Sequence, residues 1–208
     1  MNWIERLYEI KNKDLYSQNG EGLLLEHISN ALGFNTGTID DIGGGDGLYL
    51  SNSRHLQNLG WDRYVIDRER GQTVTVENIL DIPLFLFERN TATVLSIDID
   101  GNDYWILDTI LQHRKPSIIV AEFNATYTNS RTIAYNPDHV WAGDSYYGFT
   151  FAAGCKLAER FGYRVIFQVA NMNMIMVRSE LVTVRVPSIT VKQNHYFKMS
   201  DRTDWVDV

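Results

Sequence analysis

The chain has 208 residues, of which 44% are hydrophobic and 22% charged, a composition typical of a globular protein that excludes a disordered one. Its 19 basic and 26 acidic side chains give a formal net charge of −7, so the chain lacks a global basic field for binding nucleic acid. The single cysteine, Cys155, excludes an intramolecular disulfide and a four-cysteine metal site.

Neither the hydropathy of the chain nor its start indicates a membrane or secreted protein. No window approaches the ~18 consecutive apolar residues of a membrane span. The first six residues lack the basic and then apolar layout of a secretion signal. We therefore expect a cytoplasmic protein.

Short β-branched runs alternate with longer amphipathic stretches. The runs predict strands at Thr38–Ile42, Tyr64–Ile66, Thr73–Val76, Val94–Ile99, Ile118–Glu122, Tyr163–Val169 and Met174–Val177. The amphipathic stretches predict helices at Gly22–Leu32, Asn102–His113 and Phe149–Phe161. This alternation predicts a three-layer α/β domain with a mostly parallel sheet. Only residues 170–173 separate the last two strands, so these should pair as an antiparallel hairpin at the end of the sheet.

We interpret residues 1–208 as a single domain. Residues 1–35 form an N-terminal helical segment, residues 36–180 the core, and residues 181–208 a polar tail whose role the sequence does not indicate. Residues 123–148 form a long loop rich in Tyr, Asn and Gly. Long loops in compact domains are usually functional, so we expect this loop to cover a site.

A glycine-rich loop follows the first predicted strand. It carries the pattern Gly-x-Gly-x-Gly at Gly43, Gly45 and Gly47, preceded by Asp41. Glycines here let the backbone approach a ligand closely. Asp67 ends the second strand, 20 positions after Gly47, where an acid accepts hydrogen bonds from ribose hydroxyls. Loop and acid together predict an adenosine ligand.

The same loop distinguishes between classes of nucleotide. Leu48 stands where the dinucleotide fingerprint needs a small residue, and no phosphate-binding Gly-Lys-Ser/Thr motif is present. Asp41 and Asp46 would repel a pyrophosphate but suit the cationic sulfonium and amino group of S-adenosylmethionine. The alternative is a tight turn with incidental glycines and a surface aspartate.

Acidic side chains follow the fourth and fifth strands. Because side chains alternate along a strand, Asp98 and Asp100 should point the same way, ~6.6 Å apart. Glu122 and Asn124 end the next strand at the same edge. These oxygens would suit Mg²⁺, and one carboxylate could act as a general base. In the alternative interpretation, Asp100 and its neighbours cap the following helix, and Glu122 pairs with an arginine.

These motifs resemble those of class I S-adenosylmethionine-dependent methyltransferases, which share the acid and glycine loop, the acid ending the second strand, and the antiparallel hairpin. More narrowly, residues 16–21, 50–54 and 96–104 resemble the FkbM-like branch. The resemblance implies a Rossmann-like fold with a seven-stranded sheet. It also implies that the cofactor is bound by Gln18, Glu21, Asp41, Gly43, Gly45, Gly47, Asp67 and Asp98.

The Ile-Asp-x-Asp strand end also resembles macrocin-type sugar O-methyltransferases. That resemblance implies that Asp98 is both base and metal ligand, with Glu122 and Asn124 as further ligands of Mg²⁺. Here the fifth strand ends in Glu-Phe-Asn where that group has paired aspartates.

We therefore predict an S-adenosylmethionine-dependent methyltransferase with Asp98 and Asp100 as catalytic residues. It would act on a hydroxyl of a sugar, a glycan or another small molecule. A non-catalytic nucleotide- or metabolite-binding domain is the main alternative. Leu48 disfavours a dehydrogenase that uses NAD, and the net charge of −7 makes nucleic acid the less favoured acceptor. The sequence leaves open whether the protein forms a homodimer.

Overall fold

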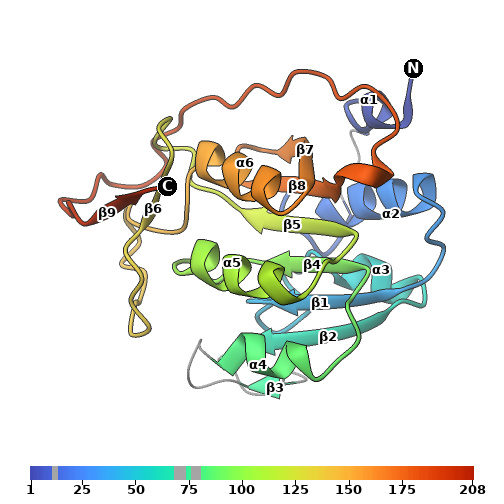
Figure 1. Ribbon diagram of the computed structural model, residues 1–208, viewed down its shortest axis with the longest axis horizontal. Helices are drawn as coiled ribbons and strands as arrows, with labels where there is room; N and C mark the ends of the chain where they lie inside the picture. Colours follow the sequence, from blue (N-terminus) through green and yellow to red (C-terminus); the bar gives the residue numbers. More distant parts are fainter. Residues whose placement is uncertain (11–13, 68–73, 76–80) are drawn as a thin grey trace.

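The computed structural model describes residues 1–10, 14–67, 74–75 and 81–208. Seven strands form its central sheet in the order β3-β2-β1-β4-β5-β8-β7 (Figure 1). Their bounds are β1 Thr38–Ile42, β2 Asp62–Asp67, β3 Val74–Thr75, β4 Val94–Ile97, β5 Ile118–Glu122, β7 Tyr163–Val169 and β8 Asn173–Arg178. The first five strands in this order are parallel, and β8 runs antiparallel to both β5 and β7. This is the predicted Rossmann-like methyltransferase fold with its antiparallel hairpin.

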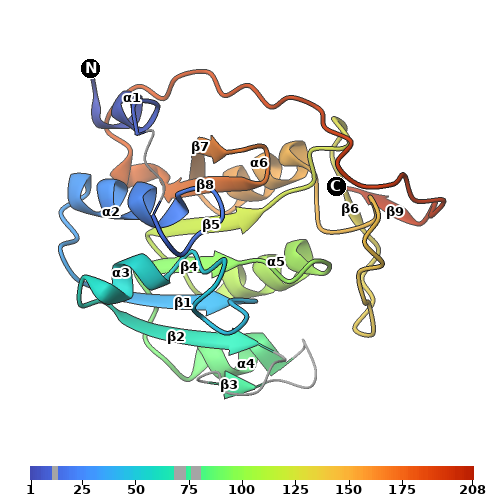
Figure 2. The same ribbon diagram turned by 180° about the vertical axis from the view of Figure 1, so that it is seen from behind.

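Helices cover both faces of the sheet. Helices α4, α5 and α6 lie on the face toward the viewer in Figure 1, and α2 and α3 lie on the opposite face in Figure 2. The bounds are α1 Trp3–Leu7, α2 Glu21–Ala31, α3 Arg54–Asn58, α4 Asp81–Phe87, α5 Asp103–His113 and α6 Phe151–Arg160. Two separate apolar clusters fill the spaces between the sheet and these helices. The three predicted layers are therefore present.

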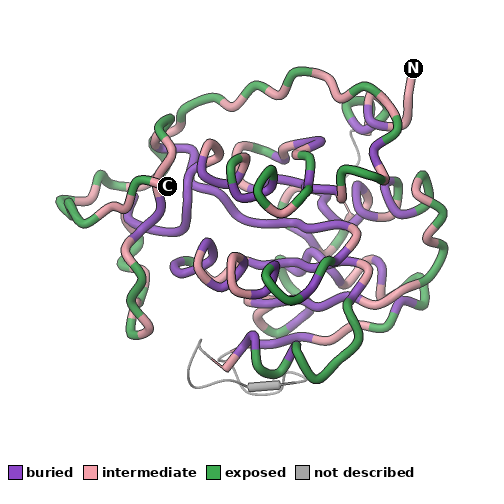
Figure 3. Tube along the Cα trace, in the orientation of Figure 1, coloured by how far each residue is buried: buried purple, intermediate pink, exposed green. Residues whose placement is uncertain are grey.

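Strands β4 and β5 are buried along their whole length, and the burial is drawn in purple in Figure 3. Strand β5 is apolar on both faces because Ile119 and Ala121 pack into one cluster while Ile118 and Val120 pack into the other. Strand β4 ends at Ile97, two residues earlier than predicted. Residues 73 and 76, at the ends of the third predicted strand, lie outside the described residues.

Several short elements carry too little periodicity to be predicted. Helices α3 and α4 are among them, as are β6 (Arg131–Ile133) and β9 (Trp205–Asp207), which pair in a separate two-stranded sheet. Helix α1 lies within the predicted N-terminal helical segment. Beyond the short 3-10 turn at Ser179–Leu181, residues 182–204 cross the outside of the molecule from the side of α1 to this small sheet (Figures 1 and 2). None of the described helices is long and apolar enough to cross a membrane.

The β7–β8 hairpin turns at Ala170 and Asn171, whose φ values are 52° and 55°. The turn closes with a 2.9 Å hydrogen bond from the Met172 amide to the Val169 carbonyl. A left-handed alanine costs about 1–2 kcal/mol, whereas glycine adopts this conformation freely.

We expect Ala170→Gly to raise the free energy of unfolding by roughly 0.5–1 kcal/mol, because the relief of this strain exceeds the entropy that glycine adds to the unfolded chain. Urea denaturation measures the change. The matched control is Ala152→Gly inside α6, which should lower stability by about 1 kcal/mol. A loss of stability in Ala170→Gly would contradict the prediction.

Candidate active site

The carboxyl ends of β1, β2, β4 and β5 meet at one edge of the sheet. The strand order changes direction here, because β1 is followed by β2 on one side and flanked by β4 on the other. Open α/β sheets bind ligands in the crevice at such a switch point. The predicted site residues reach this edge from the glycine loop, β2 and the ends of β4 and β5.

The three glycines of the loop have different surroundings. A Cβ on Gly43 would lie 1.6 Å from the carbonyl oxygen of Asp98, so the backbones of these two strand ends touch. A Cβ on Gly47 would lie 2.8 Å from the Arg63 guanidinium. A Cβ on Gly45 would meet nothing within 4 Å among the described residues. Gly45 is therefore the glycine that leaves room for a ligand.

Asp67 lies where it was predicted, at the end of β2. Its Oδ2 accepts a 2.8 Å hydrogen bond from the Gly45 amide, which ties the glycine loop to the second strand. Asp67 and Gly45 therefore lie side by side at the edge of the sheet. Direct contact between Asp67 and a ribose stays a prediction.

Asp41 lies beneath the loop and does not face the crevice. Its side chain is buried, accepting hydrogen bonds from Ser53 and, at 3.3 Å, from Ser51. Burial raises the pKa of this carboxyl, and the two serines and Arg63 oppose the shift. Asp41 therefore supports residues 51–53, and its predicted contact with the cofactor stays a prediction.

Gln18 and Glu21 come from the N-terminal segment. Gln18 is exposed, whereas Glu21 is buried at the start of α2 and accepts hydrogen bonds from the Asn173 side chain at 3.0 Å and the Asn19 amide at 2.8 Å. Glu21 adds negative potential at Asp98. Cofactor binding by Gln18 and Glu21 stays a prediction.

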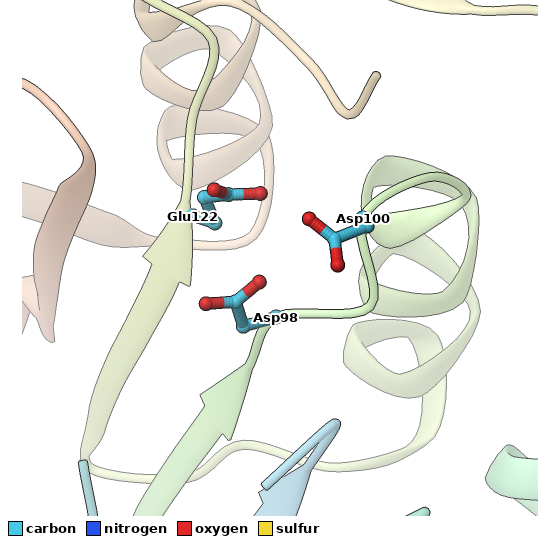
Figure 4. A group of neighbouring side chains, drawn as sticks. All are labelled: Asp98, Asp100 and Glu122. Carbon is cyan, nitrogen blue, oxygen red and sulfur yellow. The ribbon is translucent and has the colours of Figure 1, made fainter. Parts of the chain in front are cut away.

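Three carboxylates converge at the ends of β4 and β5. Asp98, Asp100 and Glu122 each offer an oxygen within 4.8 Å of the others, and Figure 4 shows the three side chains pointing toward one another. The predicted convergence is confirmed, but strand alternation does not cause it. Strand β4 ends before Asp98, and Asp100 has a left-handed φ of 54°, so a turn of the loop brings the two aspartates together.

Asp103 fixes this loop. Its fully buried carboxylate accepts 2.8 Å hydrogen bonds from the amides of Ile99 and Gly101. Asp103, the first residue of α5, therefore holds the loop before the helix, and the N-cap residue Asn102 makes no side-chain capping hydrogen bond. Asn102 instead exchanges hydrogen bonds of 2.7 and 3.0 Å with the backbone of Asn136, joining the β4 end to the long loop.

Burial and mutual repulsion act together on the carboxyl groups. The pKa of Asp98 is raised well above its ordinary value by burial first and then by Asp103 and Asp100. The pKa of Glu122 is also raised well above its ordinary value, by burial and then by Asp98. The Oε2 atom of Glu122 is buried and has no hydrogen-bond donor among the described residues. Burial and the neighbouring carboxylates thus disfavour the ionised forms of both Asp98 and Glu122.

Asn124, a predicted metal ligand, has a different role. Its fully buried amide donates to the carbonyls of Ser145 and Tyr147, both at 3.0 Å, and its carbonyl accepts from the Thr126 amide at 3.0 Å. These bonds hold the long loop against β5. We therefore reduce the candidate ligand set to the three carboxylates.

Two further residues near the carboxylates were not assigned from sequence. Tyr147 is buried, and burial raises the pKa of its phenol, with Glu122 and Asp100 adding to the shift. His139 packs on Gly101, where a Cβ would lie 2.5 Å from its Cδ2. Both belong to the loop of residues 123–148, whose length and tyrosine content were the only sequence signal.

No protein-family model matches the chain, and no curated protein matches it. Similar solved structures include a candidate hemolysin from Streptococcus thermophilus (13% identity, 81% of this chain and 69% of that chain, TM-score 0.49). A second is 1,6-didemethyltoxoflavin-N1-methyltransferase from Burkholderia thailandensis with bound S-adenosylhomocysteine (11% identity, 85% of each chain, TM-score 0.48). A third is the O-methyltransferase TomG from Streptomyces achromogenes with S-adenosylmethionine (16% identity, 86% and 90%, TM-score 0.44). These likenesses are too low to transfer an activity or establish the FkbM-like branch.

We expect the free energy of unfolding to fall as the pH rises from 4 to 6. Burial raises the pKa of Asp40 and of Asp103 from 3.8 to about 6, so in this window the folded protein keeps protons that the unfolded chain has lost. Each group would contribute about 3 kcal/mol. Urea denaturation from pH 4 to 8 in a chelating buffer tests this.

Asp103→Asn serves as the variant for comparison, because it should flatten the profile without removing the contribution of Asp40. The acids with lowered pKa, including Asp204 at about 2, favour the folded state at higher pH and act mainly below pH 4. Stability that rises between pH 4 and 6 would contradict the prediction.

Proposed function

We propose that this protein is an S-adenosylmethionine-dependent methyltransferase that methylates a hydroxyl of a sugar or another small hydroxylated molecule. The observation that carries the proposal is the arrangement at one sheet edge. An open glycine, Gly45, is hydrogen-bonded to the acid that ends β2, and a cluster of carboxylates stands at the ends of β4 and β5. The glycine and the acid suit a nucleoside, and the carboxylates at the ends of β4 and β5 suit the removal of a proton.

The cofactor fits the chemistry of the glycine and the acid. Asp67 offers carboxylate oxygens for ribose hydroxyls, and Gly45 leaves space for close approach. The acids Asp46, Glu21 and Asp98 at this edge favour a cationic ligand over a pyrophosphate. S-adenosylmethionine, when bound, supplies a methyl group on a positively charged sulfur.

Asp98 is the candidate general base. As the acceptor oxygen forms its bond to the methyl carbon and the bond from that carbon to sulfur breaks, the hydroxyl proton passes to the Asp98 carboxylate. Burial and its acidic neighbours raise the pKa of Asp98, which brings its basicity closer to neutral pH, where a base is most effective. The hydrogen bonds of Asp103 to the adjoining loop hold Asp98 in place.

We also propose that the cluster of Asp98, Asp100 and Glu122 binds Mg²⁺. Oxygens on opposite sides of such an ion lie ~4.2 Å apart, and ~4.8 Å apart for Ca²⁺, close to the spacing in this cluster. The buried Glu122 Oε2, which lacks a donor among the described residues, supports this assignment. Bound Mg²⁺ would keep the carboxylates ionised and orient the acceptor oxygen.

The charge of the cluster also bears on the acceptor. Several carboxylates at the site would repel phosphate groups, so a neutral hydroxyl is favoured over the backbone of a nucleic acid. The net charge of −7 acts in the same direction.

Isothermal titration with S-adenosylhomocysteine tests the cofactor. We expect binding, and Asp67→Asn should weaken it roughly ten- to hundredfold, because a hydrogen bond to a charged acceptor contributes about 1.5–3 kcal/mol. Asp62→Asn, at the exposed start of the same strand, is the matched control and should bind like the wild type. Equal affinities for both variants would reject the ribose assignment, and no binding by the wild type would reject the proposed cofactor.

Transfer of a labelled methyl group from S-adenosylmethionine to a panel of methyl glycosides and small polyols tests the catalytic role. Asp98→Asn should abolish transfer while changing the affinity for S-adenosylhomocysteine less than about threefold, or ~0.7 kcal/mol. Asp138→Asn, in the exposed part of the long loop, should remain active. Normal turnover by Asp98→Asn would refute its role as base.

Mn²⁺ binding, followed by electron paramagnetic resonance, tests the metal without a turnover assay. We expect Glu122→Gln to weaken binding by roughly tenfold or more, because it removes the ligand whose oxygen is buried without a donor. A chelator should lower methyl transfer. If the chelator has no effect and Asp98→Asn is still inactive, Asp98 acts as a base without a metal.

A further inference from the structure

The C-terminal residues are joined to the long loop along its length. We call residues 193–208 the C-terminal clamp. Its hydrogen bonds to the loop run from the Gln193 side chain to the Thr126 carbonyl (2.6 Å), from the Asn194 amide to the Ala125 carbonyl (3.1 Å), and from the Ser200 amide to Ser145 Oγ (2.9 Å). The clamp ends in β9, which pairs with β6 at the end of the molecule seen in Figures 1 and 2.

Aromatic rings fill the space between the clamp and the loop. Phe197 meets Trp141 at 4.9 Å and Tyr147 at 5.7 Å between ring centroids, in both cases edge to face. Trp205 meets Tyr146 at 5.0 Å. The clamp therefore packs on both residues of the Tyr146–Tyr147 pair.

Tyr147 is also held by the end of strand β5. The Asn124 amide donates to the Tyr147 carbonyl at 3.0 Å, and Glu122 lies two residues before Asn124 on the same strand end. The Tyr147 side chain is buried and lies within electrostatic range of Glu122, Asp98 and Asp100. A buried tyrosine is thus held between the clamp and the end of the strand that carries Glu122.

A donor near the cluster would complement its carboxylates, which can bind only the proton side of a hydroxyl. Ionised carboxylates only accept hydrogen bonds, whereas a phenol that stays neutral can donate one to an acceptor oxygen. The aromatic rings packed on Tyr147 offer an apolar surface that suits the carbon face of a sugar ring. Tyr147 supplies the donor, and Trp141 and Phe197 supply the rings.

We propose that the C-terminal clamp builds the acceptor side of the site, with the Tyr147 hydroxyl donating a hydrogen bond to the acceptor and Phe197 positioning Tyr147 and Trp141 around the acceptor ring. This inference rests on the proposed function and names the residues that would bind its sugar acceptor. Phe197 is a positioning residue, because it acts through the two rings that it contacts.

Saturation-transfer NMR on the full chain loaded with S-adenosylhomocysteine tests the proposal. The probes are methyl α-D-glucopyranoside, methyl α-D-galactopyranoside and methyl α-L-rhamnopyranoside. We expect at least one probe to bind the wild type. Tyr147→Phe should weaken that probe roughly fivefold, the loss of one hydrogen bond, while the affinity for S-adenosylhomocysteine changes less than about twofold.

Phe197→Ala should weaken the same probe by a similar factor, and Phe197→Tyr, which keeps the ring, should restore it. Tyr196→Ala is the matched control, because this neighbour is 70% exposed, and it should bind the probe like the wild type. If Phe197→Ala fails to fold, Tyr147→Phe decides alone, since it removes a single oxygen atom.

The outcomes separate the two proposals. A protein that does not bind S-adenosylhomocysteine refutes the proposed function and this inference with it. If S-adenosylhomocysteine binds but no probe shows saturation transfer, the proposal that the clamp, Tyr147 and Trp141 bind a sugar ring is overturned. Equal probe affinities for the wild type, Tyr147→Phe and Phe197→Ala would overturn the proposed role of the clamp and Tyr147 in acceptor binding. The proposed methyltransferase function would not be affected.

Discussion

The buried carboxylate of Asp103 determines the geometry of the candidate site. By accepting hydrogen bonds from the amides on either side of Asp100, it holds the chain in a turn directly after β4. Asp100 takes a left-handed conformation within this turn, and its side chain points back toward Asp98 and Glu122. Without that turn, repulsion between the acids would favour their separation.

Concentrating carboxylates at one edge costs stability that the rest of the fold has to supply. Strands β4 and β5, fully buried between two apolar clusters, fix the two sides of the site and limit how far the acids can move apart. A bound cation would relieve the same repulsion. Ligand binding and stability are therefore coupled at this edge, since a group that binds only the folded state also stabilises it.

The sequence predicts those features that depend on short stretches of chain. The strands Thr38–Ile42, Ile118–Glu122 and Tyr163–Val169 have their predicted bounds. The last two are runs of mostly apolar residues, and the first is bounded by Gly37 and Gly43. Asp41 and Asn124 show where prediction from short stretches of sequence fails. A polar residue at a strand end can face the crevice or anchor a neighbouring loop, and the path of that loop decides which. Here both side chains anchor loops.

The proposed acceptor side could not be predicted from sequence patterns, for a related reason. Strands β6 and β9 have three residues each and come from distant parts of the chain, so their pairing leaves no periodic signal. The proposed cofactor side consists of a glycine loop and an acid only about 20 residues apart, a spacing that can be recognised directly. A sequence with both kinds of site therefore indicates its cofactor more readily than its acceptor, because the residues around Tyr147 are assembled only by tertiary contacts.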